Sequence, residues 1–243
     1  MVGVRDDAVA WHDVECASFS HDLPLWRELA EERPGPVLDI GCGTGRVALD
    51  LASLGHAVTA LDSDPELVRE LSRRARERGL RVETIATDAR SFSLPARFPL
   101  VIAPMQVVQL LGGSKGRAAF FACARSALAP GGILAVALSD PAEAVPEEEV
   151  LPPLPDVREE DGWVLSSRPL AMRPEPGGVV IERLRQAVSP AGELSEQLTL
   201  LHLDELTPSQ LEQEAQEVGL SPVGRRRVPE TRDYLGSTVV LLA

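Results

Sequence analysis

The segment VLDIGCGTGR, residues 37–46, decides the fold of this chain. It opens with four mostly apolar residues, a pattern typical of a short buried strand. Three glycines at alternate positions follow, and glycine permits positive φ angles and lets a ligand approach the backbone. A helix is then expected over residues 44–54, with Gly55 at its carboxyl end. The segment therefore predicts a strand, a glycine-rich turn and a helix in direct succession.

Strand and helix signals keep alternating after this segment, as they do in βαβ units. Asp64, Pro65 and Glu66 are typical of a helix start, which predicts a helix that ends near Gly79. Further strands are expected over residues 56–61, 80–86, 100–103 and 133–138, and a further helix over residues 116–128. Five strands joined in this way indicate an α/β fold with a doubly wound, mostly parallel sheet.

Further elements are expected before and after these alternating strands and helices. Residues 6–32 are expected to be helical, with Asp22 as an N-cap. Residues 163–203 have the residue pattern and the turn residues of three antiparallel strands. A final helix and two strands, over residues 220–228 and 237–243, then complete a seven-stranded main sheet.

Composition limits the functions that the chain can have. The 243 residues include 44% hydrophobic side chains and carry a formal net charge of −13, which argues against nucleic acid as a partner. The three cysteines have no metal-ligand spacing, and the four histidines form no metal motif. The sequence shows no basic N-terminal region and no run of about 18 apolar residues. We therefore expect a soluble, unprocessed, cytoplasmic protein with no membrane span and no metal site.

The spacing of the glycines distinguishes two kinds of cofactor. A dinucleotide-binding turn has the pattern G-x-G-x-x-G, and Arg46 stands where its third glycine should be. The pattern from Asp39 to Gly45, acidic-x-G-x-G-x-G, resembles motif I of the class I S-adenosylmethionine-dependent methyltransferases. This resemblance implies a Rossmann-like methyltransferase sheet and S-adenosyl-L-methionine as the cofactor. A tight strand-to-helix turn that binds no ligand is the alternative explanation of the same glycines.

The resemblance also implies which residues contact the cofactor. Its methionine side would be lined by Asp39, Gly41, Cys42 and Gly43. Asp62 ends the second expected strand about 20 residues after the turn, where a carboxylate can accept hydrogen bonds from ribose hydroxyls. The family places Ser63 and Leu67 near the ribose and the adenine.

Later motifs follow in the family's order. Asp88 and Ala89 follow the third expected strand, where the family binds the adenine. Residues 98–104, which include Ala103, resemble the fourth-strand motif that runs beside the cofactor, and residues 128–132 resemble the turn before strand five. An aspartate after a strand is also a common turn former, which is the alternative interpretation of Asp88, and the adenine contact is preferred.

No catalytic acid or base follows the fourth strand, where the chain reads MQVVQLL over residues 105–111. In small-molecule relatives an N-terminal helix often brings a tyrosine to the cofactor, and the matching stretch here is residues 11–13. His12 and His21 are the candidate catalytic residues, although a capped or solvated imidazole is the favoured explanation of each. Methyl transfer is an in-line displacement that depends mainly on positioning, so a general base is optional for an amine acceptor.

We divide the chain into five parts. They are an N-terminal helical cap (1–35), an S-adenosylmethionine-binding Rossmann-like core (36–140), an acidic proline-rich linker (141–162), an antiparallel insertion that serves as substrate platform or dimer surface (163–205), and a C-terminal helix and strands that complete the core (206–243).

The sequence thus predicts an S-adenosylmethionine-dependent methyltransferase that acts on a nitrogen or oxygen atom of a small molecule. The acceptor would enter between residues 10–25, residues 105–109 and the insertion. Residues 103–106 lack the signature of adenine and glutamine methyltransferases, which disfavours those substrates. A nicotinamide-dependent oxidoreductase, a non-catalytic S-adenosylmethionine-binding module and a peptide methyltransferase are the alternatives. An exposed edge of the insertion is also compatible with a homodimer.

Overall fold

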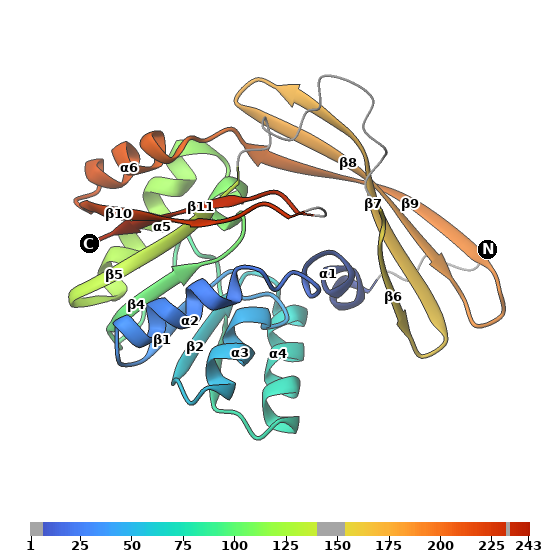
Figure 1. Ribbon diagram of the computed structural model, residues 1–243, viewed down its shortest axis with the longest axis horizontal. Helices are drawn as coiled ribbons and strands as arrows, with labels where there is room; N and C mark the ends of the chain where they lie inside the picture. The colour runs from blue at the N-terminus through green and yellow to red at the C-terminus, as the bar shows by residue number, and fades with distance from the viewer. Residues whose placement is uncertain (1–6, 140–153, 232–233) are drawn as a thin grey trace.

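The computed structural model describes residues 7–139, 154–231 and 234–243 (Figure 1). A seven-stranded sheet lies at its centre in the order β10-β11-β5-β4-β1-β2-β3. The pairs β10–β11 and β11–β5 are antiparallel and the other pairs are parallel. The strands are β1 (Val37–Ile40), β2 (Val58–Asp62), β3 (Val82–Ala86), β4 (Phe98–Ala103), β5 (Leu128–Leu138), β10 (Pro222–Val228) and β11 (Ser237–Leu242). The predicted doubly wound, mostly parallel sheet is confirmed.

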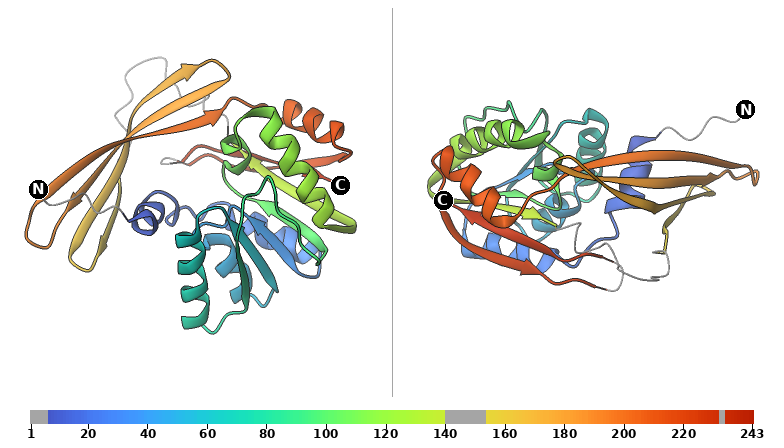
Figure 2. Two further views of the ribbon diagram at one scale, coloured as in Figure 1. Left: turned by 180° about the vertical axis from the view of Figure 1, so that it is seen from behind. Right: turned by 90° about the horizontal axis from the view of Figure 1, so that it is seen from above.

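Helices cover both faces of this sheet (Figure 2). One face packs against α2 (Leu23–Glu32), α3 (Arg46–Ser53) and α4 (Pro65–Glu77), and the other against α5 (Gly113–Ala127) and α6 (Pro208–Glu217). Successive residues of β1 explain the two layers, because Val37 packs with Trp26 and Leu51 whereas Leu38 packs with Phe120. Each face of the sheet therefore has its own apolar core.

Local interactions decide where the helices begin. Asp64 accepts a hydrogen bond from the backbone N–H of Glu66 at 2.7 Å, as predicted for the start of α4. α3 begins at Arg46, two residues later than predicted, because Gly45 has a left-handed φ of +95°. Asp22 makes no side-chain cap for α2, contrary to prediction. Its carboxylate instead accepts hydrogen bonds from the guanidinium group of Arg46.

A second sheet projects from the main one (Figure 1). It consists of β6 (Asp156–Glu160), β7 (Trp163–Glu175), β8 (Gly178–Val188) and β9 (Leu194–Asp204), all antiparallel. β7–β9 are the three strands that the sequence predicts. β6 corrects the predicted linker 141–162, of which residues 141–153 lie outside the described residues. The mostly charged sequence of β6 gives no apolar alternation, and the strand forms by backbone pairing with β7.

The N-terminal helix α1 (Ala8–Cys16) packs between the two sheets (Figure 2). Its residues Ala10, Trp11 and Val14 form a small apolar core with Leu165 and Ala187 of the second sheet. The expected helical cap therefore contacts the antiparallel insertion. None of the helices in the described ranges is long and apolar enough to cross a membrane.

Candidate active site

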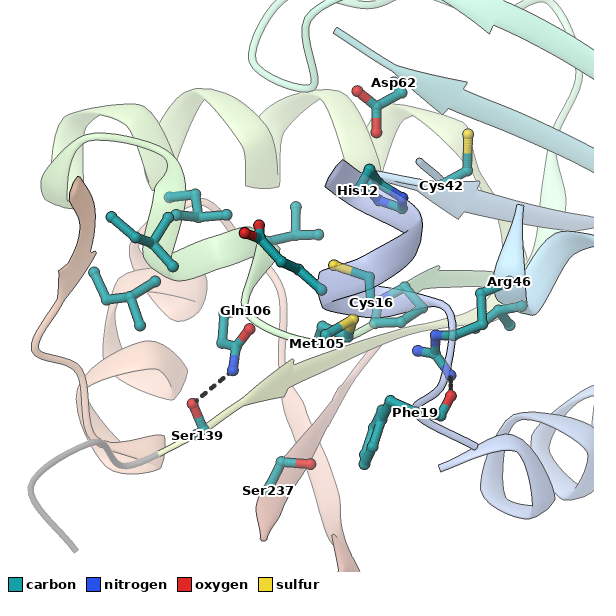
Figure 3. Close-up of a pocket in the computed structure, with 18 of the residues that line it drawn as sticks. His12, Cys16, Phe19, Cys42, Arg46, Asp62, Met105, Gln106, Ser139 and Ser237 are labelled. Carbon is teal, nitrogen blue, oxygen red and sulfur yellow. Dashed lines mark hydrogen bonds between the residues drawn. The ribbon is translucent and has the colours of Figure 1, made fainter. Parts of the chain in front are cut away.

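A cavity of about 650 Å³ opens at the carboxyl ends of the parallel strands. The strand order reverses between β1 and β4, and ligands of such sheets bind at this point. The cavity is bounded by the glycine turn, α1, the loop after β4 and the inner face of the second sheet. Figure 3 shows Asp62, His12 and Cys42 in its upper part and Gln106, Ser139 and Ser237 in its lower part, with Met105 and Cys16 between the two groups.

The three motif glycines have positive φ angles and close neighbours. The φ angles of Gly41, Gly43 and Gly45 are +72°, +53° and +95°. A Cβ atom on Gly41 would lie 2.5 Å from the Val107 side chain, and one on Gly43 would lie 2.1 Å from the His12 ring. Backbone geometry and packing thus require glycine here even without a ligand. The case for a ligand depends on the polar groups around the turn.

Among the polar groups around the turn, Asp39, the residue before the last one of β1, gives the strongest evidence for a ligand. The residue is only 1% exposed, and neither carboxyl oxygen has a hydrogen-bond partner of normal geometry in the described part of the chain. Burial raises its pKa to about 7, with a smaller contribution from Asp62, while Arg46 opposes the shift. A buried carboxyl without a partner is costly, and a cationic ligand group beside it would remove that cost.

Asp62 is held rigidly at the end of β2. Its Oδ2 atom accepts a hydrogen bond from the backbone N–H of Gly43, and its Oδ1 atom accepts one from Asp64, both at 2.9 Å. These bonds couple the glycine turn to the neighbouring strand. A carboxylate has about four acceptor positions, so Asp62 retains lone pairs for ligand hydroxyl groups. Ser63 follows it in the cavity lining.

Asp88 has a partner that the sequence does not reveal. The Arg90 side chain forms a two-point ion pair with its carboxylate, with a shortest distance of 2.6 Å. Hydrogen bonding from Arg90 also lowers the pKa of Asp88. Both residues line the cavity together with Ala89. The expected adenine-binding carboxylate is therefore ionised and already oriented by a neighbouring cation.

The two candidate histidines have different surroundings. His12 lies against Gly43, and its Nδ1 atom is 3.3 Å from the Thr44 hydroxyl, so both ring nitrogens face the glycine turn. Burial lowers the pKa of His12, which favours the neutral ring at pH 7. His21 is exposed, lies near the rings of Phe19 and Tyr234, and does not line the cavity.

The structure brings most of the predicted site residues together. The cavity lining includes His12, Asp39, Gly41, Cys42, Asp62, Ser63, Asp88 and Ala89. It does not include Gly43, Leu67, Ala103 or His21. The His12 ring covers Gly43, while Leu67 and Ala103 are buried. Direct ligand contact by these residues stays a prediction.

Only some of residues 105–109, which are predicted to lie beside the acceptor, line the cavity. Met105 lines the cavity and has a φ of +58°, which is unusual for a residue with a side chain. Gln109 does not line it, because its amide is buried and bonded to the backbone of Ser139 and Asp204. Gln109 therefore links the loop after β4 to the ends of β5 and β9, and its amide is not available to an acceptor.

The sequence gives no indication of a cluster of charged side chains that borders the cavity. Arg183 of β8 donates hydrogen bonds to Asp156 of β6 and to Ser167 of β7, both at 3.0 Å, and lies 3.6 Å from Glu15 of α1. Burial by itself raises the pKa of Glu15, but Arg185, Ser167 and Arg183 together outweigh it, and the pKa lies below its usual value. These residues lie far apart in sequence, so no local pattern connects them.

Known proteins of similar sequence are methyltransferases. Residues 37–132 match a family model described as a methyltransferase domain. A ubiquinone biosynthesis O-methyltransferase from Methylocella silvestris is 34% identical over 99 residues, which are 40% of this chain and 37% of that protein. The chain thus matches well under half of the length of this relative.

Two solved structures share nearly the whole fold. The CcbJ methyltransferase from Streptomyces caelestis has a TM-score of 0.73 and 22% identity, covering 97% of this chain and 96% of the other. CalS10 from Micromonospora echinaspora, an amino pentose methyltransferase solved with S-adenosylmethionine bound, has a TM-score of 0.69 and 21% identity, covering 96% and 95%.

Residues 37–132 thus match a methyltransferase domain, as the glycine motif predicts, and the described fold is that of known methyltransferases. CalS10, which shares this fold, was solved with S-adenosylmethionine bound, the cofactor that the glycine motif predicts for this chain.

Proposed function

We propose that this chain transfers a methyl group from S-adenosylmethionine to a nitrogen or oxygen atom of a small molecule. The observation that carries the proposal is the buried, unpartnered carboxyl of Asp39, which lies beside the glycine turn in a cavity of about 650 Å³. The methionine part of the cofactor carries an ammonium group, which such a carboxyl would bind. The residues present therefore fit the cofactor.

Each part of the cofactor has matching groups in this chain. Asp39, Gly41, Cys42 and Gly43 would hold the methionine side, with Gly43 acting through its backbone. Asp62 and Ser63 would bind the ribose hydroxyls, and Leu67 would support them from the core. Asp88 and Ala89 would bind the adenine, and Ala103 would support the site from β4. When bound, the cofactor supplies an electrophilic methyl group on a sulfonium centre.

Positioning is the main catalytic device that these residues offer. The ring nitrogens of His12 face the glycine turn, so His12 is better suited to orient the cofactor than to take a proton from the acceptor. His21 lies outside the cavity lining. An in-line displacement needs mainly the correct approach of the acceptor lone pair, and correct orientation is worth several kcal/mol.

A small acceptor fits the surroundings better than nucleic acid. The chain carries a net charge of −13, which repels a polyphosphate backbone. The proposed acceptor space is walled by α1, the loop after β4 and the inner face of the second sheet. The free thiols of Cys16 and Cys42 in this lining agree with the proposed cytoplasmic location.

We also propose a homodimer formed through strand β9, which is an edge of the second sheet. Leu194, Leu198 and Leu200 are each more than half exposed on one face of this strand. Antiparallel pairing of two β9 strands about Thr199 would place Leu198 opposite Leu200 and Glu196 opposite His202 of the partner subunit. Both apolar and charged side chains are thus complementary to a second copy of the strand.

A turnover assay separates this enzyme from a non-catalytic binding module. Methyl-labelled S-adenosylmethionine is incubated with the chain and a small-molecule cell extract, and label in amine and alcohol products is counted. We expect transfer by the wild-type chain and at least a tenfold loss in Asp62→Ala. Tight cofactor binding without transfer to any product would contradict the proposal.

A further inference from the structure

The half of the cavity away from the glycine turn has a mostly apolar wall. It is formed by side chains from the loop after β4, from residue 154 and from β7–β9, namely Met105, Leu154, Met172, Ile181, Leu201 and Leu203. Such walls bind the apolar body of a ligand and leave its orientation to a few polar groups. An acceptor seated here would be largely apolar.

The charges around the cavity disfavour an anionic acceptor. The described lining contains the carboxyl groups of Glu15, Asp39, Asp62, Asp88 and Asp156, against the guanidinium groups of Arg46, Arg90 and Arg183. Each of these arginines already pairs with a carboxylate, namely Asp22, Asp88 and Asp156. A phosphate or carboxylate group on the acceptor would therefore have to break an existing ion pair.

Asp156 is the polar group best placed to orient an acceptor in this half. Its Oδ2 atom accepts a hydrogen bond from Arg183, whereas its Oδ1 atom accepts none from the described residues. The side chain is 25% exposed and lines the cavity. It lies on the inner face of β6, opposite to the face that carries the neighbouring Val157 and Glu159. One oxygen is thus fixed and the other is open to a hydrogen-bond donor.

We infer that the acceptor is an amine with a predominantly apolar body and no phosphate group, and that the Oδ1 atom of Asp156 binds the acceptor N–H. This inference rests on the proposed function and specifies its substrate class. An acceptor that arrives as its ammonium ion first loses one proton to water. The neutral amine then donates its N–H to the carboxylate, and the nitrogen lone pair is directed away from Asp156. As the lone pair bonds to the methyl carbon, the carbon–sulfur electron pair passes to sulfur and S-adenosylhomocysteine forms. Asp156 balances the product ammonium, which loses its proton to water after release.

A matched set of probes tests the substrate class in the complex with S-adenosylhomocysteine. The probes are 4-phenylbutylamine, 4-phenylbutanol, 4-phenylbutanoate and 4-phenylbutyl phosphate, and the readout is the thermal midpoint of the saturated complex. We expect the amine to raise the midpoint most and the two anions least. The preference for amine over alcohol should disappear in Asp156→Asn and persist in Glu159→Gln, whose side chain is exposed on the outer face of the same strand.

Binding of S-adenosylhomocysteine alone is measured first for each variant by calorimetry. Its affinity should be unchanged in Asp156→Asn, because Asp156 lies outside the residues assigned to the cofactor. A complex that prefers the phosphate ester or the carboxylate, shows no preference for the amine, or keeps an unchanged amine preference in Asp156→Asn overturns the inference. Failure of the wild-type chain to bind S-adenosylhomocysteine overturns the proposed function instead.

Discussion

At the scale of single residues, acidic side chains at the carboxyl ends of the parallel strands surround the proposed cofactor site. Asp39, Asp62 and Asp88 each end or follow a parallel strand, and all three line one cavity. The sequence cannot predict that Arg90 pairs with Asp88, or that Arg183 joins Asp156 to Glu15, because these contacts depend on side-chain directions and on distant strands. It also cannot show that Leu67 and Ala103 turn into the core.

The buried Asp39 predicts an unusual dependence of stability on pH. The pKa of the Asp39 carboxyl is about 7 in the folded chain, whereas its ordinary value is 3.8. The folded state therefore holds this proton more tightly than the unfolded state does. The resulting stabilisation is complete below about pH 4 and is lost as the pH rises through about 7. The free energy of unfolding of Asp39→Asn minus that of wild type, both without cofactor, should increase by at least about 1 kcal/mol from pH 5 to pH 8. Urea unfolding at both pH values measures this, and an equal difference at both contradicts it.

Gly43 offers a steric test of the glycine turn. Gly43→Ala places a Cβ atom 2.1 Å from the His12 ring at a φ of +53°, so we expect a loss of about 2–4 kcal/mol. Adding His12→Ala should recover part of it. Gly55→Ala is the control, because it has a φ of +93° and no atom near the new Cβ, and should cost about 1 kcal/mol. Equal losses for both glycines in thermal unfolding would refute the close approach of His12.

At the scale of elements, apolar alternation and capping residues predict most strands and helices. α4 starts at its predicted cap, and β7–β9 and most strands of the main sheet lie within a few residues of the predicted ranges. β5 differs, because it begins at Leu128 and includes residues 128–132, which the sequence predicts as the turn before it. β6 is missed because charged side chains dominate it and its pairing with β7 is not encoded locally. Helix α1 is predicted, but its role as a link between the two sheets is visible only in three dimensions.

Asp13 tests this link. Its buried carboxylate binds the Thr44 hydroxyl at 2.7 Å, Arg74 of α4, and Arg158 of β6 at 3.0 Å. Removing one partner of a buried ion pair leaves unbalanced charge, so Asp13→Ala should lower the free energy of unfolding by about 3–5 kcal/mol. Asp50→Ala, which breaks a partly exposed pair with Arg27, should cost much less, because solvent screens that pair. Chemical denaturation compares the two, and similar losses would argue against the link.

At the scale of the whole molecule, the sequence predicts the fold class and leaves the assembly open. Among the described residues no strand pairs with the outer edge of β9, on which Leu198 and Leu200 are 59% and 62% exposed. We predict a dimer of the 26.1 kDa chain in light scattering and a monomer for the double variant Leu198→Lys, Leu200→Lys. Leu54→Lys, exposed to 54% elsewhere, should stay dimeric. A wild-type monomer at all concentrations would exclude this interface.

The central claim is that the cavity beside the glycine turn binds an adenosyl cofactor. Isothermal titration of the purified chain with S-adenosylhomocysteine and with NAD tests it most directly, repeated with Asp62→Ala and with Glu159→Gln as the control. We predict one site per chain for S-adenosylhomocysteine, an affinity at least tenfold lower in Asp62→Ala and unchanged in Glu159→Gln, and no heat with NAD. Tighter binding of NAD, or S-adenosylhomocysteine binding that does not depend on Asp62, would contradict the account.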